Sequence, residues 1–138
     1  MSVSELPLIL VIEDEYAVQG FVEDALSEAG FATEIFSSAE EALTLYQSGK
    51  YKALVTDIRL RATWNGWDGA RQVREREPHL PVIYMTGAAA DEWAARGVPG
   101  SIVLSKPFAP AQLVTAVSQL INAAGPVIDP PAQGSAPA

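Results

Sequence analysis

Five short apolar runs alternate with segments of helical periodicity along most of the chain, and this alternation limits the folds available to it. The runs span residues 8–12, 32–36, 53–55, 81–85 and 102–104. Parallel strands need crossover connections between them, and strands covered on both faces read as unbroken apolar runs. The sequence therefore predicts an α/β fold in which five helices cover a five-stranded parallel sheet on both faces.

Capping residues set the expected ends of these helices. The predicted helices span residues 18–29, 38–49, 69–76, 88–96 and 110–124. Gly30 ends the first, and Ser37 with Glu40 three residues later forms a capping-box pair that begins the second. Asp68 is the expected cap of the third helix, and Pro110 suits the first turn of the last.

Polar and charged residues follow four of the five apolar runs. Glu13 and Asp14 follow the first, Asp57 the third, Thr86 the fourth and Lys106 the fifth. In open parallel sheets, ligands bind beyond the carboxyl ends of the strands. If the first, third, fourth and fifth strands are neighbours, these five side chains converge on one crevice.

The chemistry of this set suits a magnesium ion and phosphoryl transfer. Neighbouring carboxylates repel one another unless a cation lies among them, and Mg²⁺ prefers one or two carboxylates together with water. Asp57 would act as the nucleophile, Lys106 would pair with a phosphoryl oxygen, and the Thr86 hydroxyl would bind another.

Four motifs at these strand ends resemble those of one known family. They are IEDE after the first run, VTDIRL at the third, MTG at the fourth and SKPF at the fifth. Together they resemble the receiver domain of two-component response regulators, from about residue 7 to residue 124. The resemblance implies a flavodoxin-like, doubly wound sheet with strand order 2-1-3-4-5.

The resemblance also implies a role for each site residue. Asp57 would accept a phosphoryl group from a histidine kinase or a histidine phosphotransfer protein. Asp14 and Asp57 would bind Mg²⁺ directly, Glu13 would act largely through water, and the Arg59 backbone carbonyl would complete the protein ligands. Thr86 would move toward the phosphoryl group, and Lys106 would form an ion pair with it.

The chain departs from the family pattern at two places. Val103 stands three positions before the lysine, where the family usually has an aromatic residue, so rotation of an aromatic ring cannot be the readout. The loop after Asp57 is long and carries Trp64 and Trp67. These tryptophans and Trp93 lie outside the periodic apolar stripes, which leaves open a partly exposed binding surface or a locally packed loop.

Composition restricts the partners. The formal net charge of −8 argues against direct nucleic-acid binding, and the basic cluster of Arg71, Arg74 and Arg76 is interrupted by acids, which favours a solvated helix face. We expect no membrane segment, because no apolar run approaches the roughly 20 residues needed to span a bilayer. The absence of cysteine is compatible with a cytoplasmic location.

The leading hypothesis is a stand-alone response regulator. Residues 1–124 would form the receiver domain, and residues 125–138, rich in Pro, Gly and Ala, a flexible tail. Its signal would pass to a downstream protein target through the last two helices and the fifth strand, a face that is also a candidate for pairing two copies. Its only expected chemistry is self-phosphorylation from phosphodonors and slow self-dephosphorylation.

Three other functions are compatible with a chain of this fold class. A flavodoxin-type FMN domain is disfavoured, since three acids stand where the phosphate loop should be. An aspartyl phosphatase would have a second acid two residues after the nucleophile, where this chain has Arg59. A phosphate sink or relay intermediate without its own output is not separated from the leading hypothesis by the sequence.

Overall fold

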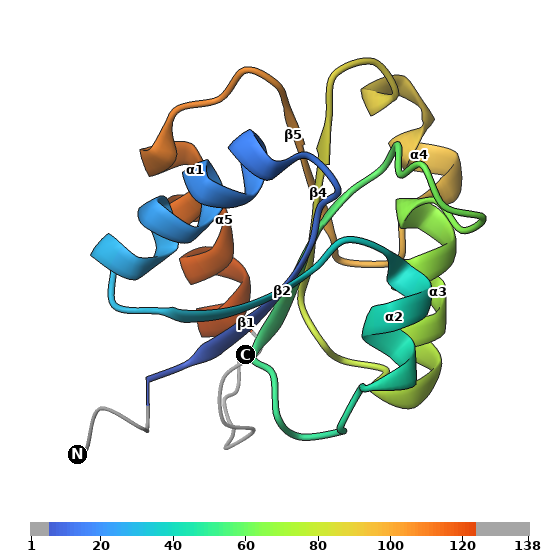
Figure 1. Cartoon of the computed structure of the whole chain (residues 1–138), viewed down its shortest axis with the longest axis horizontal. Coiled ribbons are helices and arrows are strands. Elements are labelled where there is room, and N and C mark those ends of the chain that lie inside the picture. Colours follow the sequence, from blue (N-terminus) through green and yellow to red (C-terminus); the bar gives the residue numbers. More distant parts are fainter. Residues whose placement is uncertain (1–5, 124–138) are drawn as a thin grey trace, which may run out of the picture.

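The computed structural model, which describes residues 6–123, contains a five-stranded sheet whose strands are all parallel and ordered β2-β1-β3-β4-β5. The strands are β1 (Leu8–Ile12), β2 (Ala32–Phe36), β3 (Ala53–Asp57), β4 (Val82–Thr86) and β5 (Ile102–Ser105). Figure 1 shows the sheet between its helices. The predicted sheet and strand order are confirmed.

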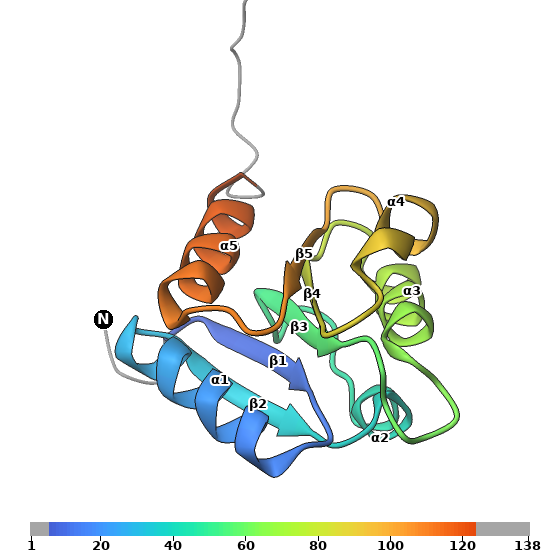
Figure 2. The same ribbon diagram turned by 90° about the horizontal axis from the view of Figure 1, so that it is seen from above.

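Helices cover both faces of the sheet, as predicted. They are α1 (Tyr16–Glu28), α2 (Ala39–Thr44), α3 (Gly66–Arg76), α4 (Trp93–Arg96) and α5 (Pro110–Ala123), and a short 3₁₀ turn, η2 (Ala90–Glu92), precedes α4. In Figure 2, α1 and α5 lie on one face, whereas α2, α3 and α4 lie on the other. The segment 88–96, predicted as one helix, instead forms the 3₁₀ turn η2 followed by the short helix α4.

The central strands supply alternate residues to two separate apolar clusters. In β1, Leu10 and Ile12 pack with α2 and α3, whereas Ile9 and Val11 pack with α1 and α5. Successive side chains of a strand point to opposite faces, so a strand buried on both faces must be apolar at every position. This is the physical reason for the unbroken apolar runs in the sequence.

The second helix begins one residue later and ends earlier than predicted. Ser38, not Ser37, is its N-cap, and the Ser38 hydroxyl accepts a hydrogen bond from the backbone N–H of Glu41 at 3.1 Å. Glu40 does not close a capping box, because it stands only two residues after this cap, and its carboxylate accepts the backbone N–H of Trp64. The helix ends at Thr44 rather than near residue 49.

The third helix begins three residues earlier than predicted, at Gly66. Asn65 is its N-cap, and its side chain accepts the backbone N–H of Asp68 at 2.9 Å. The Asp68 carboxylate in turn accepts the backbone N–H of Asn65 at 3.1 Å, which completes a capping box. Asp68 is thus the reciprocal partner of the cap rather than the cap itself.

The ends of α1 and α5 agree more closely with the sequence. Gly30, just after the C-cap of α1, has φ +94°, a backbone conformation that favours glycine. The helix α5 begins at Pro110 as predicted. The last residue of the predicted helix, Ala124, and the predicted tail 125–138 lie outside the described residues.

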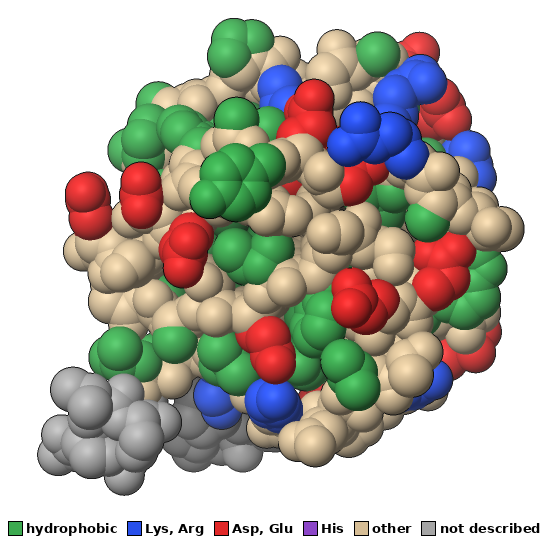
Figure 3. Space-filling model, viewed as in Figure 1, with side chains coloured by type: hydrophobic (Ala, Val, Ile, Leu, Met, Phe, Trp, Pro, Cys, Tyr) green, Lys and Arg blue, Asp and Glu red, His purple; other side chains and the backbone are tan. Residues whose placement is uncertain are grey.

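The basic cluster on α3 is largely engaged in contacts within the protein. Arg74 donates to the Leu80 carbonyl, Arg76 donates to the Leu43 carbonyl, and Arg71 pairs with Asp68. The face shown in Figure 3 carries scattered acidic groups and small basic groups rather than one broad basic patch. Among residues 6–123, no helix is both long enough and apolar enough to span a bilayer.

Candidate functional site

The carboxyl ends of β1 and β3 bring three carboxylates together, as predicted. The two strands are neighbours in register, with Ile12 opposite Thr56, so the residues that follow them emerge side by side. Carboxylate oxygens of Glu13, Asp14 and Asp57 all lie within 4.8 Å of one another. Glu13 and Asp57 are buried, whereas Asp14 lies nearer the surface.

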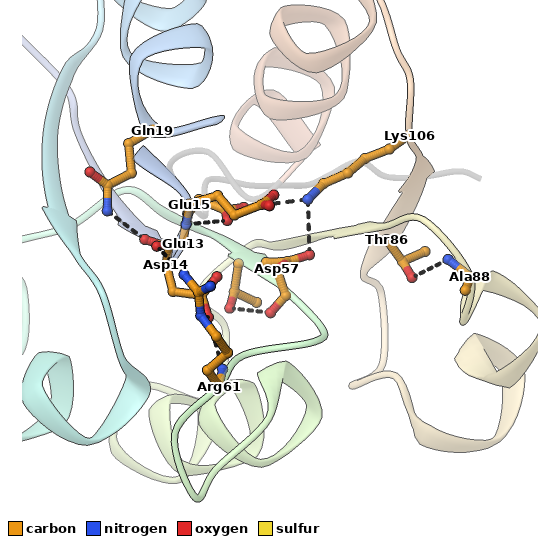
Figure 4. Close-up of polar contacts among 10 residues, drawn as sticks. Glu13, Asp14, Glu15, Gln19, Asp57, Arg61, Thr86, Ala88 and Lys106 are labelled. Carbon is orange, nitrogen blue, oxygen red and sulfur yellow. Dashed lines mark hydrogen bonds and ion pairs between the residues drawn. The ribbon is translucent and has the colours of Figure 1, made fainter. Parts of the chain in front are cut away.

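Lys106, just after β5, supplies a cation to two of these acids. Its Nζ lies 3.3 Å from Asp57 Oδ1 and 3.5 Å from Glu13 Oε1 (Figure 4). The backbone N–H of Lys106 donates to the Thr86 carbonyl at 2.7 Å, which fixes the lysine against the end of β4. The predicted convergence of Lys106 with the acids is confirmed.

Burial and charge perturb the titration of these groups. Burial raises the pKa of Glu13 and of Asp57, and in both cases the nearby Lys106 offsets only part of the rise. For Lys106 itself, burial alone would lower the pKa, but Asp57 and Glu13 together outweigh burial and raise it. Burial is therefore the main cost of keeping both acids charged, and nearby acids add a smaller one.

Thr86 is at the predicted strand end, but its hydroxyl is turned toward the following loop. Its Oγ1 accepts the backbone N–H groups of Ala88 at 3.1 Å and Ala89 at 2.8 Å. In Figure 4 the side chain points toward Ala88 rather than toward Asp57. In this structure the Thr86 hydroxyl therefore contacts the loop after β4 and does not converge with the acids, and its movement toward a phosphoryl group stays a prediction.

Arg59 lies on the exposed loop two residues beyond Asp57. The role expected for it involves its backbone carbonyl and not its side chain. That role stays a prediction.

Sequence reasoning missed two residues that contact the acidic residues, one through a carboxylate and one through a backbone carbonyl. Arg61 contacts Asp14 through both its backbone and its guanidinium. Gln19, on α1, donates from its side chain to the Glu13 carbonyl at 2.6 Å. No periodic pattern could assign a partner to an arginine in an irregular loop. Gln19, in contrast, lies on the first turn of the helix that follows the acids, so its proximity could have been inferred.

The backbone of Asp57 is packed tightly against the start of α3. The backbone N–H of Gly66 donates to the Ile58 carbonyl at 2.8 Å. A Cβ atom on Gly66 would lie only 2.2 Å from the Asp57 carbonyl oxygen, so this position requires glycine. The pair Asn65-Gly66 is a sequence pattern that could have predicted both the cap and the close approach.

The tryptophans of the long loop are mostly packed. Trp67 is only 1 % exposed, and its ring centroid lies 4.7 Å from that of Tyr84, so for this residue the packed alternative holds and the exposed one does not. Trp64 is half-buried against the same apolar cluster. Trp93 keeps an exposed fraction of 36 %, and its indole N–H donates to the Ser101 hydroxyl at 2.9 Å.

Val103 pairs with Tyr84 across the β4–β5 ladder and packs against the cluster that contains Trp67. At this position a compact aliphatic side chain is part of the core packing. The large aromatic rings next to it come from β4 and α3 instead.

The donor set fits a hard divalent cation. Three carboxylates from two neighbouring strand ends can turn oxygens toward one point, and two of them are desolvated enough to gain from an added positive charge. Asp57 is also held next to Lys106, so an oxygen of its carboxylate lies beside a group that stabilises added negative charge.

Comparisons with known proteins agree with this geometry. The family model described as "Response regulator receiver domain" matches residues 9–118. A crystal structure of a response regulator receiver protein from Sinorhizobium medicae is 45 % identical, has a TM-score of 0.84, and is covered over 99 % of its length by 88 % of this chain.

Two curated proteins illustrate the range of sizes among the relatives. The response regulator receiver protein CpdR of Brucella abortus is 32 % identical over 84 % of this chain and 98 % of its own length. The transcriptional regulatory protein CusR of Escherichia coli is 30 % identical over 87 % of this chain but only 53 % of its own length. The chain thus spans about half the length of CusR and nearly all of CpdR.

Proposed function

The chain belongs to the response regulator receiver domain family, and we propose that its Asp57 accepts a phosphoryl group in an Mg²⁺-dependent reaction. The donor is a phosphohistidine on a histidine kinase or a histidine phosphotransfer protein. The observation that carries the proposal is the meeting of Glu13, Asp14 and Asp57 within 4.8 Å, with Lys106 beside Asp57.

The transfer needs a nucleophile, a cation beside it and a leaving group. An oxygen of the Asp57 carboxylate forms a bond to phosphorus as the phosphorus–nitrogen bond to histidine breaks, and the imidazole keeps that electron pair. Lys106 stabilises the charge that gathers on the phosphoryl oxygens. Mg²⁺ bound by Asp14 and Asp57, by Glu13 through water and by the Arg59 carbonyl would neutralise those oxygens further.

We propose further that the chain acts as a stand-alone cytoplasmic regulator, with a receiver domain over residues 1–124 and a tail over residues 125–138. The near-complete coverage of CpdR supports this reading, since that relative is itself a response regulator receiver protein of similar size. The protein would also phosphorylate itself from small phosphodonors and slowly hydrolyse its own acyl phosphate. It would not turn over a metabolite.

The signal would leave through protein contacts of α4, β5 and α5. Phosphorylation would add charge next to Lys106 and draw the Thr86 hydroxyl away from the backbone of the following loop. Lys106 directly follows β5, and Thr86 pairs with Ser105 of β5, so both changes occur beside this face. The added group can shift the face only by its different interaction with two states. Because Val103 stands at the usual aromatic position, the change at this face would be in the packing of aliphatic side chains. The same face would support pairing of two copies.

Labelling with acetyl phosphate tests the acceptor. With Mg²⁺ present, wild-type protein and the control Asp24→Asn, at an exposed position on α1, should both gain one phosphoryl group by intact mass. Asp57→Asn should gain none, and a metal chelator should abolish labelling of the other two. Equal labelling of Asp57→Asn would move the acceptor elsewhere and refute the proposal.

Amide chemical shifts test the output face. Beryllofluoride with Mg²⁺ mimics an acyl phosphate, and we expect shifts at Asp57 to be accompanied by shifts along α4, β5 and α5. Changes confined to the immediate surroundings of Asp57 would contradict an output through this face.

A further inference from the structure

We propose that the guanidinium of Arg61 is a built-in counter-cation for Asp14 that competes with Mg²⁺ and so sets how much Mg²⁺ the site requires. The inference rests on the proposed function, because it concerns the metal site of the phosphoacceptor. It assigns a regulatory role to a residue of the long loop after β3.

Arg61 makes three contacts with Asp14. Its backbone N–H donates to Asp14 Oδ2 at 2.8 Å, its Nε lies 3.3 Å from the same oxygen, and its Nη2 donates to the Asp14 backbone carbonyl at 3.0 Å. Figure 4 shows the arginine extended from its loop to the end of β1. One carboxylate oxygen therefore receives both a main-chain donor and a side-chain cation.

The backbone and the side chain of Arg61 have separable roles. The main-chain N–H fixes the orientation of the Asp14 carboxylate, and any residue at position 61 other than proline would supply it. The guanidinium adds a positive charge, and its side chain is 77 % exposed whereas that of Asp14 is 12 % exposed. Removing the side chain should therefore leave the ligand in place and remove only the charge.

Two cationic side chains pair with different members of the acidic cluster. Lys106 pairs with Glu13 and Asp57, and Arg61 pairs with Asp14. Because Lys106 is only 23 % exposed and is anchored at the end of β5, it cannot easily leave. The Arg61 side chain is exposed, and a divalent cation bound to Asp14 would share the Asp14 carboxylate with its guanidinium. The guanidinium and the metal ion would repel each other there, so Arg61 must turn outward into solvent or weaken the binding of Mg²⁺.

The rest of the loop remains anchored when the arginine turns away. The backbone N–H of Trp64 donates to Glu40 Oε2 at 3.0 Å, and the capping box of Asn65 and Asp68 holds the start of α3. An exchange of Arg61 for a metal ion at Asp14 thus needs movement of one exposed side chain and no refolding of the loop.

The test compares Mg²⁺ affinities in the full chain by amide shifts of Asp14 and Asp57. Arg61→Met removes the charge and keeps the aliphatic stem. We expect it to lower the Mg²⁺ dissociation constant about three- to tenfold in dilute buffer, with a smaller difference in high salt. The matched control is Arg71→Met, which removes one positive charge from a pair on α3 and should stay within about twofold of wild type.

The outcomes separate this inference from the function it rests on. Tighter binding by Arg61→Met alone supports the inference. Unchanged binding overturns it and leaves the proposed function intact, and weaker binding overturns it by making Arg61 a positioning residue for Asp14. A wild-type protein that shows no Mg²⁺ binding and no Mg²⁺-dependent labelling would remove the proposed function itself.

Discussion

Carboxylates are buried or half-buried at both ends of the sheet, but they are satisfied differently. At the amino-terminal end, Glu34 accepts the Tyr51 hydroxyl at 2.7 Å and pairs with Lys50 Nζ at 3.2 Å, and Glu77 accepts the Tyr46 hydroxyl and the backbone N–H of Gly49. At the carboxyl end, three acids share one half-buried lysine and one exposed arginine as side-chain cations, and two of the acids also accept a backbone N–H.

The pKa shifts run in opposite directions at the two ends. The hydrogen bond from Tyr51 lowers the pKa of Glu34, whereas burial raises the pKa of Glu13 and of Asp57. Glu34, with a hydroxyl donor and Lys50 beside it, is favoured as an anion, whereas burial disfavours the charged forms of Glu13 and Asp57. The amino-terminal pairs therefore hold the fold together, and the carboxyl-end acids remain ready to bind more positive charge.

The largest expected effect comes from removing the shared cation. Lys106→Met removes the cation that pairs with both Glu13 and Asp57, and we expect it to cost about 1–3 kcal/mol of the free energy of unfolding. Saturating Mg²⁺ should recover part of this loss, because a ligand that binds only the folded state stabilises it. Denaturant unfolding with and without chelator measures both effects.

The control for this experiment is Lys52→Met, at an exposed position. It should change the free energy of unfolding by less than about 0.5 kcal/mol and should not respond to Mg²⁺. Equal losses for the two lysine variants would contradict the contrast between the ends of the sheet.

A smaller effect is expected at the amino-terminal end. Tyr51→Phe removes the hydroxyl that binds Glu34 and should cost about 0.5–1.5 kcal/mol, with no dependence on Mg²⁺. Tyr16→Phe, whose side chain is 89 % exposed, serves as the control and should be nearly neutral. A Tyr51→Phe loss that Mg²⁺ relieves would mean that the two ends are coupled.

The smallest effect is a pH dependence of opposite sign at the two ends. The carboxyls of Glu13 and Asp57 bind protons more tightly in the folded state, so their cost to stability shrinks as pH falls toward their ordinary pKa values. Glu34 has a lowered pKa, so its contribution persists above about 4.5 and is lost only at lower pH.

Lowering the pH from about 7 to about 5 in chelated buffer should raise the free energy of unfolding of wild type. We expect this rise to be smaller in Glu13→Gln, by about 1 kcal/mol or less. Glu34→Gln should keep the wild-type slope over this range. Chemical unfolding at several pH values measures the two slopes, and a reversed order would show that the raised pKa values are misassigned.

The fold was predictable because its signals are redundant. Apolar runs such as 8–12 supply residues to two clusters at once, so no other arrangement buries them as well. Helix starts were less predictable, because Ser37 and Ser38 are equally good caps in sequence. The structure uses Ser38, whose hydroxyl accepts the backbone N–H of Glu41, and Glu40 binds the Trp64 backbone instead of a cap.

The site was predictable where residues follow strands and unpredictable where they lie on loops. The meeting of Glu13, Asp14, Asp57 and Lys106 follows from strand order alone. The contact of Arg61 with Asp14 depends on the path of an irregular loop, which no periodicity encodes. The sequence left open whether Trp67 is packed, because α3 begins earlier than expected and this start turns the ring against Tyr84.

The most direct test of the central claim identifies the phosphorylated atom chemically. Borohydride reduces an aspartyl phosphate to homoserine, so protein treated with acetyl phosphate and Mg²⁺ can be reduced, digested and mapped by mass spectrometry. We predict homoserine at position 57 and nowhere else, and none when Mg²⁺ is chelated. Homoserine at another aspartate, or none at all in phosphorylated protein, would contradict the account.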